Sequence, residues 1–263
     1  MIRTLRYYLE SGTDPYKNLA LEKYLTETAQ EGVCTLYLWQ NRHTVVIGRN
    51  QNAWQECRTT ELAKDGGHLA RRLSGGGAVY HDMGNLNFTF CVRTQDYDLR
   101  RQQRVIVEAC RLLGIPAEIS GRNDVLTDGR KFSGNSFYSH DGCSFHNGTL
   151  LLNVDMANLG KYLNPSKAKL ESKGVPSVRS RVVNLCEQKP ELSVEMMEKA
   201  MIAAFETVYG CRAEPLCSAD FDQRRLHELW EGFSSWDWNY GKMRPFSFSC
   251  SAKFDWGEIT LEF

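Results

Sequence analysis

The sequence predicts a mixed α/β fold, of the α+β kind, in which helices flank a mostly antiparallel sheet. One observation is the alternation of apolar and polar residues in short segments, which in 86–92 would place Leu86, Phe88 and Phe90 on one face of a strand. The other is that segments with helical spacing of apolar residues lie between such strands without a regular strand–helix–strand repeat. Together these observations favour antiparallel pairing.

The expected elements can be followed along the chain. Asp14 and Pro15 form a favourable N-cap and first-turn pair, and apolar residues from Leu21 onward recur at helical spacing. Asp128-Gly129 is a strong signal for a hairpin turn. Further helices are expected near 52–64, 99–113, 192–209 and 220–230, and strands at 35–39, 44–47, 68–73, 86–92 and 145–153.

The composition excludes several classes of protein. With 263 residues, 42% hydrophobic and 24% charged, the chain can bury a substantial core as one large domain or one and a half. Its 32 basic and 32 acidic residues give a formal net charge of zero, which argues against a general nucleic-acid binder. The nine cysteines form neither a CxxC pair nor a zinc spacing, so we expect reduced thiols. Because we find no signal-peptide pattern and no membrane-length apolar stretch, we expect a cytoplasmic protein.

Residues 71–82 carry the strongest local signal and read Arg-Arg-Leu-Ser-Gly-Gly-Gly-Ala-Val-Tyr-His-Asp. Three consecutive glycines are expected where a ligand contacts the main chain or where φ is positive. Arg72 is a natural bidentate partner for a phosphate or carboxylate, and the N–H groups of the glycines can complete an anion-binding nest. Neither the P-loop spacing nor the dinucleotide-binding spacing is present, which indicates another nucleotide chemistry. A solvated glycine-rich turn is the alternative interpretation.

A second group of polar residues surrounds the expected hairpin turn. Residues 121–124 read Gly-Arg-Asn-Asp, and residues 129–136 read Gly-Arg-Lys-Phe-Ser-Gly-Asn-Ser. The hairpin would bring Asp124 close to Lys131 across two antiparallel strands. A partly dehydrated lysine keeps its charge beside an anion, so Lys131 is a candidate for gripping a carboxylate or a phosphate. A solvated surface lysine is the alternative interpretation.

Taken with two further segments, these motifs resemble the lipoate-protein ligase A family of the biotin/lipoate ligase superfamily. The resemblance runs essentially from end to end, and its motifs occur in the same order and with the same spacing. One departure is Asn147, where many relatives carry a second histidine, and we interpret it as a tuning change. The matching segments are 71–82, 121–124, 130–134, 145–151 and 177–182.

The resemblance implies a large curved sheet around the ligand and a reaction in two steps. Lipoate would attack the α-phosphate of ATP to give lipoyl-AMP, and the acyl group would then move to a lysine of a lipoyl domain. The acceptors would be 2-oxoacid dehydrogenase E2 subunits and the glycine cleavage H protein. Mg²⁺ would bind through the phosphates of ATP, so no dedicated metal ligands are assigned.

The resemblance also implies roles for individual residues. Lys131 would be catalytic, because it would contact both the lipoate carboxyl group and the α-phosphate. His81 and His146 are either general bases or hydrogen-bonded structural residues, and we leave them out of the catalytic set. ATP or lipoyl-AMP would be bound by Arg72, Ser74, Gly75, Gly76, Gly77, Ala78, Val79, Tyr80, Asn85, Asn123, Asp124 and Lys131. A loop covering the adenylate would contain Lys173, Gly174, Val175, Ser177, Val178, Arg179 and Arg181.

The resemblance further divides the chain into a catalytic domain, residues 1–245, and the start of a C-terminal accessory domain, residues 246–263. We expect 246–263 to form a two-stranded hairpin, which would begin an accessory domain that is either truncated or completed by a separate accessory subunit. Three alternatives remain: a transferase that only uses preformed lipoyl-AMP, an octanoyltransferase with Cys143 or Cys186 as nucleophile, and a non-catalytic sensor of an acyl-adenylate.

Overall fold

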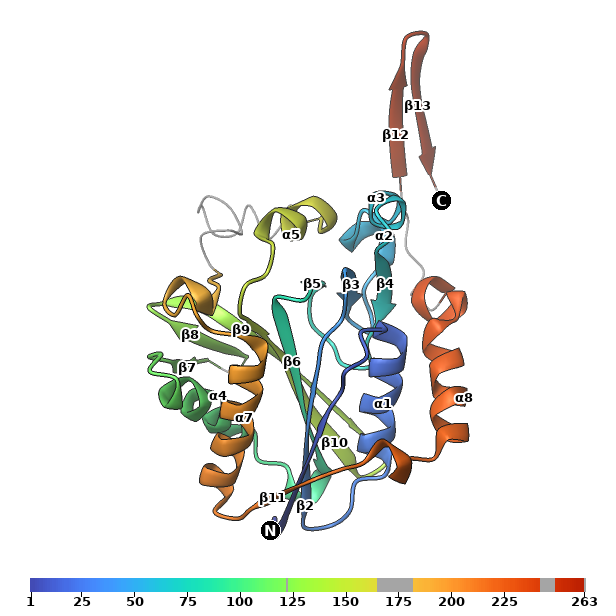
Figure 1. The fold of residues 1–263 in the computed structure, drawn as a ribbon. Coiled ribbons are helices and arrows are strands. Elements are labelled where there is room, and N and C mark those ends of the chain that lie inside the picture. Colours follow the sequence, from blue (N-terminus) through green and yellow to red (C-terminus); the bar gives the residue numbers. More distant parts are fainter. Residues whose placement is uncertain (122, 165–181, 242–248, 263) are drawn as a thin grey trace.

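The structure of the chain is a computed structural model that describes residues 1–121, 123–164, 182–241 and 249–262. Across these residues, the main element is an eight-stranded mixed sheet with the strand order β11-β1-β2-β6-β10-β9-β8-β7 (Figure 1). Strand β1 pairs in parallel with β2 and β11, and the other neighbours are antiparallel, which confirms the expected fold class. The strands are β1 (Thr4–Leu9), β2 (Val33–Trp39), β6 (Asn85–Arg93), β7 (Glu118–Ser120), β8 (Asp124–Thr127), β9 (Arg130–His140), β10 (Cys143–Leu151) and β11 (Ala213–Pro215).

Helices cover both faces of this sheet, as Figure 1 shows. One apolar cluster joins the sheet to α4 and α7 and includes Phe88 and Phe90, while a second joins the opposite face to α1 and α8 through Tyr37 and Phe145. The helices are α1 (Pro15–Glu27), α2 (Ala53–Glu56), α3 (Thr59–Lys64), α4 (Leu99–Leu112), α5 (Met156–Tyr162), α7 (Val194–Tyr209) and α8 (Gln223–Ser234), with short turns at η1 (Thr94–Asp96), η3 (Leu185–Glu187), η4 (Ser218–Asp220) and η5 (Asp237–Gly241).

A three-stranded sheet holds the glycine-rich segment. Strand β3 (Thr44–Ile47) lies between β4 (His68–Arg71), its parallel neighbour, and β5 (Val79–His81), its antiparallel neighbour. Residues 72–78 connect β4 to β5, so the expected loop between strands is confirmed. The predicted strand at 68–73 is shorter than expected because the backbone leaves the sheet at Arg72.

Local sequence signals account for most element boundaries. Asp14 caps α1 by accepting hydrogen bonds from two backbone N–H groups of the first turn, as predicted. The prediction of one helix near 52–64 is wrong, because the segment forms two short helices, α2 and α3. Cys57 between them has an extended backbone and forms an antiparallel bridge with Leu163, which interrupts the helix. Strands β1, β5, β7 and β11 and helix α5 were not predicted.

The C-terminal residues form the expected hairpin of two antiparallel strands, β12 (Ser249–Phe254) and β13 (Gly257–Glu262). Figure 1 shows this hairpin extending away from the main sheet. The division into domains at 1–245 and 246–263 stays a prediction. In the part of the chain that the structure describes, no helix is long and apolar enough to cross a bilayer.

Arg71 ties the end of the main body to the small sheet. Its side chain is fully buried, and this burial lowers the pKa of the guanidinium. The guanidinium donates to the backbone oxygens of Trp238 (2.9 Å) and Asn239 (2.7 Å) and, on its other side, to that of Gln51 (2.6 Å). The amide side chain of Asn239 in turn accepts from the backbone N–H of Arg71 at 2.8 Å. Arg71 is therefore a structural residue that joins three segments.

We expect Arg71→Met to lower the free energy of unfolding by about 3 kcal/mol or more, because several buried carbonyl groups would lose their donor. Urea unfolding measures this change. Arg100→Met is the matched control, since Arg100 is exposed on α4, and its effect should stay within about 0.5 kcal/mol. Equal effects of the two substitutions would contradict the anchoring role of Arg71.

Candidate active site

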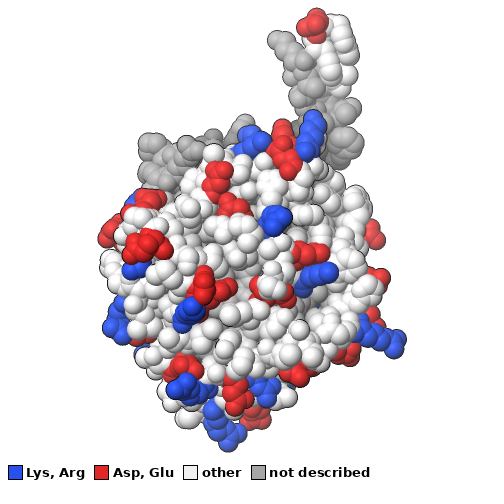
Figure 2. All heavy atoms as spheres, in the orientation of Figure 1, with Lys and Arg blue, Asp and Glu red and all other residues white. Residues whose placement is uncertain are grey.

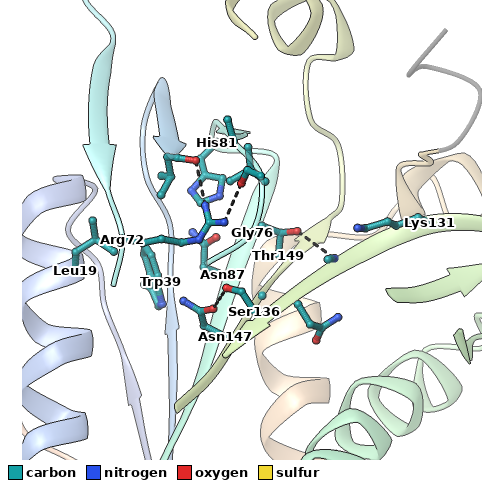
Figure 3. A pocket seen from close by; sticks show the side chains of 17 residues that line it. Leu19, Trp39, Arg72, Gly76, His81, Asn87, Lys131, Ser136, Asn147 and Thr149 are labelled. Carbon is teal, nitrogen blue, oxygen red and sulfur yellow. Dashed lines mark hydrogen bonds between the residues drawn. The ribbon is translucent and has the colours of Figure 1, made fainter. Parts of the chain in front are cut away.

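A cavity of about 310 Å³ lies between the glycine-rich segment and the face of the main sheet (Figure 3). One cross-strand row forms its floor: Trp39 of β2 pairs with Asn87 of β6, and Asn87 pairs with Thr149 of β10. On β9, Gly134 continues this row and donates its N–H to Thr149 Oγ1 at 3.4 Å. Because neighbouring strands lie about 4.8 Å apart, the floor from β2 to β9 spans roughly 14 Å. Figure 3 shows Leu19 and Trp39 at one end and Lys131 at the other.

The buried polar face of β6 supplies this floor. The predicted alternation is confirmed, since Phe88 and Phe90 belong to the apolar cluster under α4 and α7. The polar residues Asn85, Asn87 and Thr89 are at most 2% exposed, although a polar strand face normally contacts solvent. A polar face that is buried in this way marks an internal binding surface.

Arg72 shapes the glycine-rich segment from inside the cavity. Its guanidinium donates to the backbone oxygens of Gly75 (2.7 Å), Gly77 (2.8 Å) and Val46 (3.2 Å). Gly76 has φ of 92°, and a Cβ atom at this position would lie 3.0 Å from Arg72 Nη2, so both backbone and space require glycine here. Burial lowers the pKa of Arg72 to about 10, which leaves it charged at neutral pH. Arg72 thus places a positive charge beside the cavity.

Lys131 and Asp124 meet at the other end, as the hairpin predicted. The structure places Lys131 Nζ 2.6 Å from Asp124 Oδ1, and both side chains are about two-fifths exposed. A β-bulge between Val125 and Leu126 shifts the register of β8 against β9 at this point. A Cβ atom at position 134 would lie 3.0 Å from the Lys131 ammonium, so Gly134 makes room for the lysine side chain.

A chain of hydrogen bonds crosses the cavity wall from the glycine-rich segment to helix α1. Ser136 donates to Asn147 Oδ1 at 2.5 Å and lies 2.8 Å from the Ser74 hydroxyl. Since Ser136 has one hydroxyl proton, Ser74 must be the donor to Ser136. Asn147 then donates to Glu22 Oε1 at 2.8 Å, and Thr89 donates to the same oxygen at 2.7 Å. Asn147, the residue that departs from the family motif, therefore connects β9 to α1.

Glu22 is a buried carboxyl group that the sequence analysis missed. Burial raises its pKa to about 7, although hydrogen bonds from Asn147 and Thr89 act in the opposite direction. Its Oε2 has no hydrogen-bond partner among the described residues. The sequence contains one signal that would have predicted its burial. Glu22 lies at helical spacing between Leu19 and Leu25, on the apolar face of α1.

The two histidines lie on opposite sides of the main sheet, His146 on β10 beside Phe88 and Phe90 and His81 on β5 beside Trp39. His146 is fully buried between Phe88 and Phe90, contacts Asn135 at 2.6 Å, and does not line the cavity. His81 lines the cavity, and its Nδ1 contacts the amide of Asn41 at 3.2 Å. Burial lowers the pKa of both rings to about 3, so both are neutral at physiological pH. This geometry favours the structural interpretation of His146.

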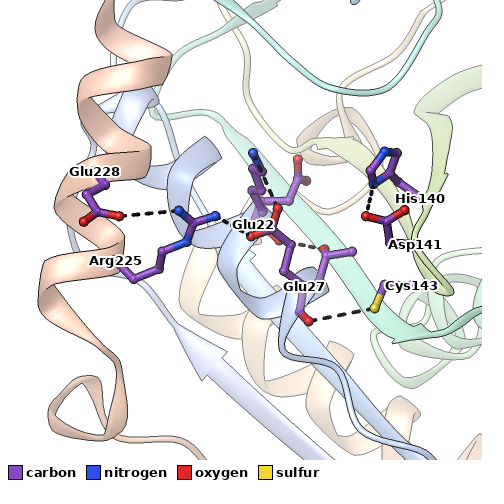
Figure 4. A network of polar contacts seen from close by, with 9 residues as sticks. Glu22, Glu27, His140, Asp141, Cys143, Arg225 and Glu228 are labelled. Atoms are coloured by element: carbon purple, nitrogen blue, oxygen red, sulfur yellow. Dashed lines mark hydrogen bonds and ion pairs between the residues drawn. The ribbon is translucent and has the colours of Figure 1, made fainter.

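The cysteine alternative receives no support from the geometry. Figure 4 shows Cys143 beside Glu27, and its sulfur contacts Arg93 Nη1 at 3.1 Å. Cys186 lies in η3, where burial raises the pKa of its thiol. Neither cysteine lines the cavity, so neither reaches a ligand bound in it.

The predicted site residues fall into three groups. Those that line the cavity are Arg72, Gly76, Gly77, Ala78, Val79 and Lys131, whereas the loop residues Lys173, Gly174, Val175, Ser177, Val178, Arg179 and Arg181 lie outside the described residues. The remaining residues do not line the cavity. Four of them contact lining residues: Ser74 and Asp124 through their side chains, Asn85 by donating to Asn87, and Asn123 by accepting from Asn135 through its backbone oxygen. Gly75 is exposed, and Tyr80 packs in the small sheet against His43.

Sequence analysis also missed most of the floor and the far end of the cavity. These lining residues are Leu19, Trp39, Val46, Asn87, Asn135, Ser136, Gly148 and Thr149. The polar residues among them stand in alternating strand segments, but the strand register that brings them together was not available. Among the described residues, no group of three acidic, histidine or cysteine side chains could hold a metal ion.

Glu22 should make the folded state less stable as the pH rises. Its pKa is about 7 in the fold against an ordinary value of 4.5, so the unfolded chain ionises first. The free energy of unfolding should therefore fall between pH 4.5 and pH 7 by about 3 kcal/mol and stay level above that range. Glu22→Gln removes this titration, while His81 and His146, which destabilise the fold as the pH falls, remain in both proteins. Urea unfolding across this range should show a difference between variant and wild type that grows with pH, and a constant difference would contradict it.

Comparisons with known proteins identify the family of the chain. Residues 14–206 match the family model described as the lipoyl protein ligase A/B catalytic domain. The chain is 41% identical over 266 residues to lipoate-protein ligase A of Blochmanniella pennsylvanica and 43% identical over 265 residues to that of Psychrobacter cryohalolentis. Each alignment covers 98% of this chain and 78% of the relative.

Solved structures show the same fold. The LipL1 protein of P. falciparum in complex with lipoate has a TM-score of 0.80 at 27% identity, covering 98% of this chain and 80% of that one. A bi-partite lipoate protein ligase of Thermoplasma acidophilum, studied with its E2 lipoyl domain, has a TM-score of 0.79 at 26% identity, covering 94% and 99%. A lipoate-protein ligase A bound with ATP has a TM-score of 0.75 at 26% identity, covering 91% and 98%. The resemblance seen in the motifs is thus confirmed, and the chain belongs to the lipoyl protein ligase A/B catalytic domain family.

Proposed function

We propose that this enzyme is a lipoate-protein ligase, which activates lipoate with ATP and transfers the lipoyl group to a lysine of an acceptor protein. The observation that carries the proposal is the form of the cavity, with a cationic end at Lys131 and an apolar end at Trp39 and Leu19. A floor of roughly 14 Å suits an extended medium-length acyl chain. The carboxyl group of such a chain would lie at Lys131, with the ring at Trp39.

The first step joins two anions, and the charges of the site favour this. A carboxylate oxygen of lipoate attacks the α-phosphorus of ATP, and the bond to pyrophosphate breaks. Lys131 would lie between the carboxylate and the α-phosphate and reduce their repulsion, while Asp124 at 2.6 Å fixes the ammonium group before the ligand arrives. The N–H groups of the glycine-rich segment, which Arg72 holds in place, would face the phosphate.

The second step transfers the acyl group from the adenylate. The ε-amine of the acceptor lysine attacks the acyl carbon, AMP leaves with the electrons of the broken bond, and the amine loses a proton. Lys131 would stabilise the negative charge that develops on the carbonyl oxygen. We propose lipoyl domains of 2-oxoacid dehydrogenase E2 subunits and the glycine cleavage H protein as acceptors, and a separate accessory subunit as a further partner. The similarity to the bi-partite ligase, which was studied with its E2 lipoyl domain, supports the E2 acceptor and the separate subunit.

Magnesium fits this site as an ion carried by ATP. The described residues contain no cluster of metal ligands, and the carboxylate of Asp124 is paired with Lys131. We propose that Mg²⁺ binds mainly through the phosphates of ATP and through water.

Mass spectrometry of an apo lipoyl domain tests the activity. Incubation with lipoate, ATP and Mg²⁺ should add the mass of one lipoyl group to the acceptor, and a parallel reaction with a supplied accessory domain shows whether adenylation needs it. Cys143→Ala and Cys186→Ala should retain transfer, because neither thiol lines the cavity. Transfer only from preformed lipoyl-AMP in both reactions would restrict the enzyme to the second step. An unchanged acceptor mass with preformed lipoyl-AMP would refute the proposed function.

We expect Lys131→Met to lower kcat for both steps by about 100-fold or more, because an ammonium group that acts at both reacting centres would be lost. Pyrophosphate exchange measures the first step, and transfer from preformed lipoyl-AMP measures the second. Lys199→Met is the matched control: Lys199 also forms a 2.6 Å ion pair, with Glu195, but it is 74% exposed on α7. Near-normal turnover of Lys131→Met in both assays would remove the lysine from the mechanism.

A further inference from the structure

The end of the cavity near Trp39 contains two polar groups that have no hydrogen-bond partner among the described residues. His81 is 3% exposed and Asn87 is 2% exposed, and both line the cavity. His81 Nε2 and Asn87 Nδ2 make no hydrogen bond within the described residues. Figure 3 shows both side chains near Trp39 and away from Lys131. Buried polar atoms without partners are rare in folded proteins and call for an explanation.

The hydrogen-bond network fixes what His81 offers to the cavity. The amide nitrogen of Asn18 donates to the backbone oxygen of Gln40 at 2.8 Å and to Asn41 Oδ1 at 3.0 Å. Asn41 therefore turns its own amide nitrogen toward His81 Nδ1, which lies 3.2 Å away and must accept. Because the buried ring is neutral, its single proton is on Nε2. His81 presents an N–H donor to the cavity.

Asn87 presents a second polar atom on the floor. Asn85 donates to Asn87 Oδ1 at 3.0 Å, which leaves both hydrogens of Asn87 Nδ2 unused. If the amide oxygen and nitrogen were exchanged in both Asn85 and Asn87, the oxygen of Asn87 would be unpaired instead of its nitrogen. Asn87 therefore has an unpaired polar atom in either orientation. Asn87 stands between Trp39 and Thr149 in the floor, and the His81 ring centroid is 6.4 Å from that of Trp39.

We propose that His81 and Asn87 select for a polarisable ring at the end of the acyl chain, so that the enzyme prefers lipoate to purely alkyl acids of similar length such as octanoate. This inference rests on the proposed function. Both atoms are already buried and unpaired in the fold, and an alkyl chain would leave them so, whereas a ligand that brings acceptor atoms would relieve this unfavourable state. The sulfur atoms of a dithiolane ring are weak hydrogen-bond acceptors and can receive N–H donors from this wall. The two residues therefore determine specificity and take no part in the chemical step.

Three acids separate this effect from ring shape. They are lipoate, octanoate and 5-cyclopentylpentanoate, in which methylene groups replace the two sulfurs of the same five-membered ring. We expect kcat/KM for acyl transfer to be about tenfold higher for lipoate than for the cyclopentyl acid, which corresponds to one buried donor left without a partner. In Asn87→Leu, a nearly isosteric change, the ratio should fall to about threefold or less, because the alkyl acids gain.

Thr149→Val is the matched control. Thr149 is the next residue of the same floor row, but its hydroxyl oxygen already accepts from Gly134. This substitution should change kcat/KM by the same factor for all three acids and leave the ratio unaltered.

Equal use of lipoate and the cyclopentyl acid by the wild-type enzyme would overturn the inference, and this measurement does not depend on the folding of any variant. An unaltered ratio in folded Asn87→Leu would overturn it as well, since it would mean that Asn87 does not contact the ring. If the wild-type enzyme transfers none of the three acyl groups even from the preformed acyl-AMP, the proposed function itself fails. A ratio that falls in Asn87→Leu and stays constant in Thr149→Val supports the selection.

Discussion

The site depends on the burial of two neighbouring guanidinium groups, those of Arg71 and Arg72. Neither forms an ion pair with a carboxylate of the described residues, and backbone oxygens take the donors of both. Burying a charge is costly unless it is hydrogen-bonded on most sides, so the segments that supply these oxygens must be in place together. Arg71 holds the segment around Asn239, while Arg72 holds the glycine-rich segment. One dipeptide at the end of β4 therefore connects the fold to the wall of the cavity.

The charge of Arg72 also acts on Glu22, the buried carboxyl group of α1. Glu22 is fully buried, and its raised pKa shows that burial outweighs the hydrogen bonds from Asn147 and Thr89 and the attraction of Arg72. With a pKa of about 7, Glu22 is only partly ionised at neutral pH and compensates the Arg72 charge in part. A buried cation that is compensated only in part attracts an anionic ligand more strongly than an exposed one, because water screens it less. The arrangement is thus suited to a carboxylate or a phosphate.

Local sequence signals predicted the parts of the site that depend on neighbouring residues. The glycine triplet and the Asp128-Gly129 turn gave the loop after β4 and the approach of Asp124 to Lys131, because both are set by backbone preferences within a few residues. The floor row of Trp39, Asn87 and Thr149 could not be found in this way, since it depends on the register of three strands that are distant in sequence. The same holds for the break of helix 52–64, which a bridge from Leu163 imposes at Cys57.

The Lys131 ammonium and the groups proposed to determine specificity lie apart along the cavity, while the buried charge of Arg72 stands beside His81. Lys131 and Asp124 stand on β8 and β9, whereas the unpaired groups of His81 and Asn87 lie near Trp39, across the strands from the ammonium. A substitution at one end changes the electrostatic stabilisation of the reacting groups, and one at the other end changes which chain is bound. Asn147 stands between them, since it connects Ser136 of β9 with Glu22 of α1. Its amide both accepts and donates in one fixed orientation, so the hydrogen bonds on the two sides of the cavity are formed together. Asn147 therefore links the glycine-rich segment, through Ser136, to Glu22 of α1.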